Sequence, residues 1–415
     1  MNTKMKKVIV IGAGAAGMMA AYFAAREGAH VIIIEKNKIL GRKIRITGKG
    51  RCNVTNASDL DTIINNIYRN GNFMYSSLYS FTNDDLIDLF ESFGLKLKTE
   101  RGNRVFPLSD KAIDVVKAME KMLDSQAVNI KTGAKVRSIL LDGNKVKGLI
   151  LSNGTKIFAD KIILATGGKS YPLTGSTGDG YTMAKECGHR VTNLYPSLIG
   201  METVQDIKRD MVGLNLRNIS IKLYKNSKEI YQDFGELEFR EYGLDGPVIK
   251  SASCYIDDFQ KNNYRILLDL KPALSNEKLD ARILRDFEKY SNNSFETGLK
   301  DLLHKKMIDY IIDKVGIDRK KPVHQVSKEE RHRLLSLIKG IDFDIKRLRP
   351  IDEAIITEGG IEVKEVNPST MESKLVEGLY FAGEILDVNA FTGGFNLQIA
   401  FSTGYLAGTS SAREK

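Results

Sequence analysis

The start of the chain constrains the fold more than any other stretch. An apolar run over residues 8–11 predicts a buried parallel strand, and it leads into the turn Gly-x-Gly-x-x-Gly of residues 12–17. A helix rich in small residues follows, and a second apolar run, over residues 31–34, ends in Glu35. Strand, glycine turn, helix, strand and acid is the order that an adenine-dinucleotide site needs. The motif alone does not choose between FAD and NAD.

Each part of this motif has a defined task. Gly12 allows the tight turn, Gly14 lets the backbone approach a pyrophosphate, and Gly17 lets the helix pack closely on the strand. The helix N-terminus offers N–H groups and the positive end of its dipole to phosphates. Glu35 can accept hydrogen bonds from ribose hydroxyls. Three glycines within six residues also occur by chance, but the flanking strands and the distal acid favour dinucleotide binding.

Composition narrows the class of protein. A chain of 415 residues with 42% hydrophobic and 27% charged residues is typical of a globular protein of two or three domains. No run approaches the roughly 18 apolar residues of a membrane span. The first strand begins almost at once and leads into the glycine turn, which does not resemble a signal peptide. We therefore expect a cytoplasmic protein with no membrane partner.

Charge and cysteine usage bear on partners. Cys52, Cys187 and Cys254 are scattered without a CxxC pair, so neither a metal site nor a redox dithiol is expected. The net charge of +10 and the pI of about 9.2 raise the alternative of nucleic acid. Because the lysines are spread along the whole chain, without an aromatic-basic repeat, nucleic acid is the less favoured partner. A basic surface also suits anionic cofactors and substrates.

Further glycine-rich stretches suggest close backbone approach to a ligand. Residues 41–56 combine glycines with basic side chains, and a buried strand ends in the Ala-Thr-Gly-Gly of residues 165–168. Residues 170–180 form a glycine-rich loop that is either a second cradle or a structural connector. Near the C-terminus, a strand over residues 377–384 ends in a glycine and an acid. A Gly-Gly pair then opens a helix over residues 397–411.

Periodicity and turn signals give the other elements. Helices are predicted over 84–93 and 110–123, capped by Asn83 and Ser109. Strands are predicted over 129–139 and 146–151, and a strand pair over 156–164. Residues 193–342 differ in character and predict an inserted domain. Its expected elements are strands at 219–223 and 266–270, a turn-rich link at 238–247, and helices at 277–290, 296–314 and 327–339, with Ser275, Ser294 and Ser327 as their candidate caps.

Several blocks carry a resemblance to a known family. They are GRKIRITGKGRCNVTN, YPLTGSTGDGYTMA, EYGLDGP and NPSTMESKLVEGLYFAGEILDVNAFTGGFNLQIAFSTGYLAG. Together with the N-terminal glycine motif they resemble the bacterial BaiN/YhiN family of FAD-dependent oxidoreductases, long labelled "NAD(FAD)-utilising dehydrogenases". The matching blocks run from residue 8 to the C-terminus, with the insert the most variable part.

The resemblance implies an α/β fold with FAD as cofactor. A Rossmann-like FAD-binding domain of the GR2 type is expected, split in sequence into residues 1–192 and 343–415. Residues 193–342 form the inserted domain, with a β-rich part and then a helical part. The family's cofactor contacts carry over to these positions: Gly12, Gly14, Ala15 and Ala16 at the diphosphate; Glu35 at the adenosine ribose; Val136 at the adenine; Glu384 at the ribityl chain; Asn396 and Leu397 at the flavin; and Lys36, Arg42, Lys43, Cys52, Asn53, Gly167 and Gly383 along the cofactor.

The implied activity is hydride or electron transfer between flavin and a small or medium organic substrate, such as a steroid-type enone. No second strand-GxGxxG-helix unit is present, so a dedicated NAD(P)H-binding domain is not expected. A nicotinamide can bind at the flavin face without such a domain, so the use of NAD(P)H as a transient donor stays open. The alternatives are an amine oxidase using O2, an RNA-modifying flavoprotein and a flavin redox sensor. No catalytic acid or base is identified. Tyr171 and Arg51 are weak candidates, His189 is expected to be structural, and the oligomeric state stays open.

Overall fold

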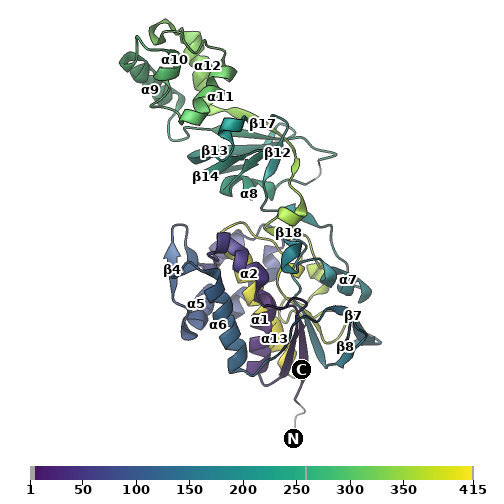
Figure 1. Cartoon of the computed structure of the whole chain (residues 1–415). Coiled ribbons are helices and arrows are strands. Elements are labelled where there is room, and N and C mark those ends of the chain that lie inside the picture. The colour runs from purple at the N-terminus through teal and green to yellow at the C-terminus, as the bar shows by residue number, and fades with distance from the viewer. Residues whose placement is uncertain (1–4, 258, 414–415) are drawn as a thin grey trace. The chain divides into compact units, whose positions relative to one another are not determined.

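A computed structural model describes residues 5–257 and 259–413 (Figure 1). The chain forms two compact units. One runs up to Ser197 and resumes at Ile351, and the other spans Leu198–Pro350. The strand β17 (Ile341–Leu348) belongs to the second unit, so that unit extends beyond the residue 342 at which the insert was expected to end.

The first unit is built on a five-stranded sheet with the order β19-β10-β1-β2-β6, and every pairing in it is parallel. Its strands are β1 (Lys7–Ile11), β2 (His30–Ile34), β6 (Asn129–Lys131), β10 (Lys161–Leu164) and β19 (Leu379–Phe381). The near-continuous apolar runs of β1 and β10 fit burial on both faces. The expected Rossmann-like α/β architecture is confirmed.

Two helices from opposite ends of the sequence pack together in this unit. In Figure 1, α1 (Ala15–Arg26, purple) lies beside α13 (Phe395–Ala412, yellow). Their contact depends on two glycines one helical turn apart. A Cβ at Gly404 would lie 2.5 Å from the carbonyl oxygen of Ala16, and one at Gly408 only 2.3 Å from that of Ala20. The first and last segments of the chain therefore form one body.

Shorter elements complete the first unit. One three-stranded antiparallel sheet has the order β3-β5-β4, another has the order β7-β8-β9, and β11 pairs with β18. The elements are α2 (Arg42–Ile46), β3 (Thr55–Asn56), α3 (Leu60–Asn65), α4 (Tyr75–Ser80), α5 (Asn83–Ser92), β4 (Leu97–Glu100), β5 (Arg104–Pro107), α6 (Ala112–Ser125), β7 (Val136–Asp142), β8 (Lys145–Leu151), β9 (Lys156–Phe158), α7 (Asp179–Glu186), β11 (Tyr195–Ser197) and β18 (Ile356–Glu358).

The second unit has its own apolar core. Six strands close a barrel in the order β12-β15-β14-β13-β16-β17. Helices follow the fifth of these strands along the chain, so the expected β-rich part and helical part are both present. The elements are β12 (Met201–Thr203), β13 (Asn215–Lys225), β14 (Lys228–Arg240), β15 (Gly243–Asp245), α8 (Pro247–Ser253), β16 (Tyr264–Asp269), α9 (Asn276–Lys289), α10 (Phe295–Gly298), α11 (Lys305–Val315) and α12 (Lys328–Lys339).

Some local expectations were wrong. Residues 238–247 are not a turn-rich link, because the end of β14 and β15 pair as strands across a tight turn. The cap of α5 is Thr82, whose hydroxyl accepts the N–H of Asp85 in a capping box. The cap of α6 is Lys111 and not Ser109. The stretch 129–139 is two strands in different sheets, which is a tertiary distinction that alternation alone does not reveal.

Within the described ranges, no helix is long and apolar enough to cross a membrane. In the same ranges, no cluster of three His, Cys, Asp or Glu side chains has a metal-binding arrangement.

Candidate cofactor site

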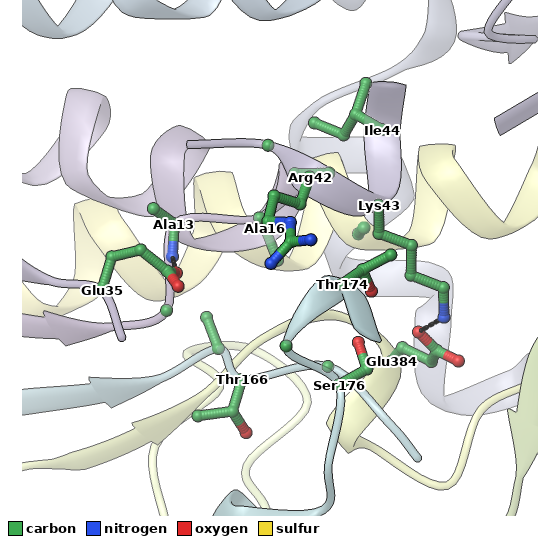
Figure 2. Close-up of a pocket in the computed structure, with 18 of the residues that line it drawn as sticks. Ala13, Ala16, Glu35, Arg42, Lys43, Ile44, Thr166, Thr174, Ser176 and Glu384 are labelled. Atoms are coloured by element: carbon green, nitrogen blue, oxygen red, sulfur yellow. Dashed lines mark hydrogen bonds and ion pairs between the residues drawn. The ribbon is translucent and has the colours of Figure 1, made fainter. Parts of the chain in front are cut away.

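A cavity lies at the carboxyl ends of the parallel strands of the first unit, where ligands bind in open α/β sheets (Figure 2). It extends from the glycine turn after β1 to the start of α13. Thirteen of the residues expected at the cofactor line it: Gly12, Gly14, Ala15, Ala16, Glu35, Lys36, Arg42, Lys43, Val136, Gly167, Glu384, Asn396 and Leu397. Cys52, Asn53 and Gly383 do not line it.

The three glycines of the turn occupy different surroundings. Gly12 has a φ of +102°, and a Cβ there would lie 2.5 Å from the carbonyl oxygen of Ala165. A Cβ at Gly17 would lie 1.9 Å from the carbonyl oxygen of Gly12. Around Gly14, by contrast, no described atom lies within 4 Å of an added Cβ. Gly12 and Gly17 therefore serve the fold, whereas Gly14 faces open space on the cavity.

Glu35 ends β2 and is held firmly at the cavity. Its side chain is only 8% exposed. One carboxylate oxygen accepts the backbone N–H of Ala13 at 2.8 Å, and the other accepts the backbone and side-chain N–H groups of Asn37, each at 2.7 Å. Figure 2 shows the carboxylate reaching back to Ala13 in the glycine turn. The glycine turn and Glu35 are thus fixed to each other by contacts within the protein itself.

The glycine-rich loop after residue 170 lies on the cavity. Thr174, Gly175, Ser176 and Asp179 belong to the lining. The ammonium of Lys36 donates to Thr177 Oγ1 at 2.6 Å and to Asp179 Oδ2 at 2.9 Å. Of the two alternatives for this loop, connector or cradle, its position on the cavity favours a cradle. The charge of Lys36 is used to hold the loop.

A triangle of polar side chains lies deeper along the same cavity. Lys43 Nζ is 2.7 Å from Glu384 Oε2 and 2.7 Å from Ser170 Oγ, and Ser170 donates to Glu384 Oε1 at 3.1 Å. The backbone N–H of Thr357 also donates to Glu384 Oε1, at 2.9 Å. Figure 2 shows Lys43 and Glu384 pointing toward each other. Sequence reasoning found the two charged residues but not Ser170, which is fully buried and lacks any pattern of its own.

The start of α13 also borders the cavity, through Asn396 and Leu397. Its cap, Gly394, has a φ of +102°, and a Cβ there would lie 2.3 Å from the carbonyl oxygen of Thr55. The Asn396 side chain accepts the N–H of Ala390 at 3.1 Å and donates to the carbonyl of Ala390 at 2.7 Å. The side-chain amide of Asn396 therefore holds the preceding loop. Asn396 also lines the cavity.

Three expected residues, Cys52, Asn53 and Gly383, are not part of the cavity lining. Gly383 has a φ of +79°, and a Cβ there would lie 2.7 Å from that of Ala16. Cys52 is completely buried. Asn53 has a buried side-chain oxygen without a hydrogen-bond partner in the described part of the chain. The weak candidate Arg51 is engaged elsewhere, because its guanidinium pairs with two carboxylates and stacks over Phe106 at 4.2 Å from the ring centre.

The buried cysteines give a testable consequence. Burial raises the pKa of Cys52 to about 12 and that of Cys187 to about 11, whereas Cys254 is only partly buried. Since the thiolate is the reactive form, we expect one fast thiol per folded chain with Ellman's reagent at pH 8, and three in urea. A Cys254→Ser variant should then show no fast thiol. Fast reaction of that variant would contradict the burial of the other two.

The residues of the cavity fit a dinucleotide. Thr166, which sequence reasoning missed, lines the cavity and has a buried hydroxyl oxygen with no partner among the described residues. Unpaired buried hydroxyls are rare and call for a ligand or water. Gly14 leaves room at the helix N-terminus, and Arg42 brings positive charge to the lining.

His189 is a structural residue. Its ring nitrogens lie 3.0 Å from Glu365 Oε2 and 2.8 Å from Ser373 Oγ. Burial lowers the pKa of His189, and the neighbouring Glu365 partly opposes that shift. His189 does not line the cavity. Through Glu365 and Ser373, His189 connects the segment that follows α7 to the segment that precedes β19.

The fold and site define a class: FAD-dependent oxidoreductases whose dinucleotide-binding unit is split in sequence by an inserted domain. Within that class, the chain belongs to the family described as HI0933-like protein Rossmann domain, whose model matches residues 6–410.

Relatives that match over nearly the full length have two different named activities. A 3-dehydro-bile acid delta(4,6)-reductase of Clostridium scindens is 30% identical over 98% of this chain and 99% of its own length. A ribosomal RNA dihydrouridine synthase of Haemophilus influenzae is 28% identical over 98% of both chains. A solved structure described as a Mycobacterium smegmatis Sdh1 complex in the apo form has a TM-score of 0.51 at 16% identity, covering 99% of this chain and 68% of that one. This likeness concerns the fold.

Proposed function

We propose that the protein reduces a carbon–carbon double bond conjugated with a carbonyl group, with NAD(P)H as the electron donor. The observation that carries the proposal is the cavity. It joins a glycine turn and ribose-binding acid at one end to the Lys43–Ser170–Glu384 triangle and the α13 N-terminus at the other. This arrangement suits a dinucleotide whose redox ring lies near α13. The expected cytoplasmic location is part of the same proposal.

The two relatives support this reaction type. The name of one specifies a 3-dehydro steroid with unsaturation at positions 4 and 6. The other makes dihydrouridine, which differs from uridine by two hydrogens across a double bond next to a ring carbonyl. Either reduction amounts to the addition of a hydride to the carbon remote from the carbonyl and of a proton to its neighbour. A shared reaction on different substrates is common among enzymes with one fold.

The chain's own residues have distinct tasks in this proposal. Bound FAD supplies the hydride. Glu35 would hold the adenosine ribose, and Gly14 with the start of α1 would hold the diphosphate. Glu384, whose orientation is fixed by Lys43 and Ser170, would accept hydrogen bonds from the ribityl chain. The first N–H groups of α13 would stabilise negative charge that collects on a reduced flavin.

The experiment that tests this function follows flavin absorbance near 450 nm in the purified protein without oxygen. We expect a yellow protein that bleaches within seconds on addition of NADH or NADPH, and whose colour returns on addition of a 4-en-3-one steroid or a uridine-containing RNA. A saturated 3-oxo steroid, which has the same size but no conjugated double bond, is the control and should not restore the colour. A protein that neither donor bleaches contradicts the reductase and favours an oxidase or a sensor.

Uridine in RNA is the second candidate substrate. The relatives named as ribosomal RNA dihydrouridine synthases favour it, as does the net charge of +10. The same experiment distinguishes the two substrates, because only the true acceptor should restore the yellow colour. Restoration by the enone alone contradicts the RNA candidate.

A further inference from the structure

A second hollow lies in the first unit, apart from the cofactor cavity, and we name it the polar groove. Its lining is mostly polar and aromatic: Tyr68, Arg69, Asn70, Arg190, Val191, Thr192, Asn193, Tyr195, Glu362, Lys364 and Asp387. None of these residues lines the cofactor cavity. We propose that the polar groove binds a single strand of RNA, with the phosphates at Arg190 and Lys364 and the bases on the tyrosines.

One wall of the polar groove is a two-stranded ribbon. Residues 190–197 run antiparallel to residues 356–362, with Tyr195 opposite Glu358 and Val191 opposite Ile361. The backbone N–H of Glu362 donates to the carbonyl of Arg190 at 3.0 Å. The ribbon therefore places Arg190 near Lys364, although they are far apart in sequence.

Some charged side chains of the polar groove form ion pairs with each other, and others are available to a ligand. Arg69 makes a two-pronged ion pair with Asp387, which is only 2% exposed. Arg190 and Lys364 are exposed, and their side chains have no hydrogen-bond or ion-pair partner within the part of the chain that the structure describes. Glu362 is the opposing charge in the lining. Two available cations against one carboxylate favour an anionic ligand.

Two tyrosines lie in the polar groove, Tyr195 with an exposed ring and Tyr68 with a half-buried one. The ring of Tyr68 packs on Phe391 with 5.0 Å between ring centres, and its hydroxyl lies 2.8 Å from Ser197 Oγ. Tyr195 is 42% exposed. Aromatic rings beside cations are the combination that binds single-stranded nucleic acids, because bases stack on the rings while phosphates meet the cations. A free phosphate would use the cations and leave the rings uncovered.

The polar groove and the cofactor cavity share their dividing wall. Asp387 lines the groove and the next residue, Val388, lines the cavity. Ile356 lines the cavity on the same ribbon that carries Tyr195. A strand in the groove would therefore lie beside the site at which one of its uridines is reduced. This inference rests on the RNA candidate of the proposed function, and it specifies how the nucleotides next to that uridine are held.

The test measures binding without turnover, by fluorescence anisotropy of a labelled 12-nucleotide oligouridine with the FAD-loaded protein between 50 and 200 mM KCl. Each phosphate contact to a single strand contributes about 0.7 to the slope of log affinity against log salt. We expect the Arg190→Ala/Lys364→Ala double variant to lower that slope by about 1.4 and to weaken binding roughly tenfold at the lowest salt. Glu362→Gln should strengthen binding by about twofold to fivefold.

Lys117→Ala/Lys121→Ala on α6 is the matched control, because it removes two exposed positive charges from the same unit away from the groove. FAD content and thermal unfolding report folding in every variant. An unchanged slope in the double variant, an equal loss in the control, or no binding by the unmodified protein at 50 mM salt overturns the inference. Complete displacement by an equal nucleotide concentration of UMP also overturns it, since that result marks a mononucleotide site.

The two proposals fail separately. Oligouridine binding that depends on Arg190 and Lys364 supports the polar groove even if no donor bleaches the flavin. Bleaching by NAD(P)H without such binding supports the reductase and overturns the groove.

Discussion

Replacing Gly14 with valine is expected to weaken FAD binding by roughly 100-fold, equivalent to about 2.8 kcal/mol, while the protein stripped of flavin folds normally. Gly14 has an extended backbone, with a φ of −86° and a ψ of −168°, which valine adopts readily. A Cβ there meets no described atom within 4 Å, so the protein itself has room for the side chain. That room is the space in which we place the diphosphate.

Two measurements decide this prediction. Isothermal titration of the stripped protein with FAD gives the affinity, and thermal unfolding of the stripped protein gives its stability, which we expect to change by less than about 1 kcal/mol. Gly17→Ala is the contrasting variant. Its Cβ would lie 1.9 Å from the carbonyl oxygen of Gly12, so it should lose stability with or without FAD. Normal FAD affinity in Gly14→Val would place the cofactor elsewhere.

Replacing Gly408 with alanine is expected to destabilise the first unit by about 2–3 kcal/mol. In an open helix the same change stabilises by about 1 kcal/mol, so propensity and packing predict opposite signs. Packing prevails here because the Cβ would lie 2.3 Å from the carbonyl oxygen of Ala20 and 3.0 Å from its Cα. These are backbone atoms that cannot rotate away, so α13 must move off α1.

Calorimetry of the stripped protein measures this effect as a lower unfolding temperature, by roughly 2–4 °C for each kcal/mol. Ser410→Ala, two residues further along α13 on its half-buried side, is the matched control and should change stability by less than about 0.5 kcal/mol. An unfolding temperature raised by Gly408→Ala would show that the two helices do not approach as closely as described.

The sequence predicted the parts of the fold that depend on local pattern. The glycine turn, both flanking strands and Glu35 are where the motif indicated, because each position is specified by its own backbone conformation or burial. The helix caps at Ser275, Ser294 and Ser327 are also confirmed. A serine just before a helical pattern indicates such a cap, and this signal can be read from the local sequence alone.

What the sequence did not predict depends on contacts between distant segments. Ser170 joins the Lys43–Glu384 pair only because the ends of two strands meet at one edge of the sheet. Thr166 became a candidate through its unpaired buried hydroxyl, which no pattern displays. The closure of six strands into a barrel is likewise a property of pairing. Short strands such as β15 were missed because glycines at both ends resemble a loop.

The packing of α1 against α13 has a consequence for how the protein is made. During synthesis the glycine turn emerges from the ribosome long before β19 (Leu379–Phe381) and α13, the strand and helix that complete its cavity. The barrel and its helices lie wholly between them, so they can fold while the nascent chain still lacks α13. Cofactor capture therefore waits for α13, and a chain truncated before α13 has no finished site in which to retain a flavin.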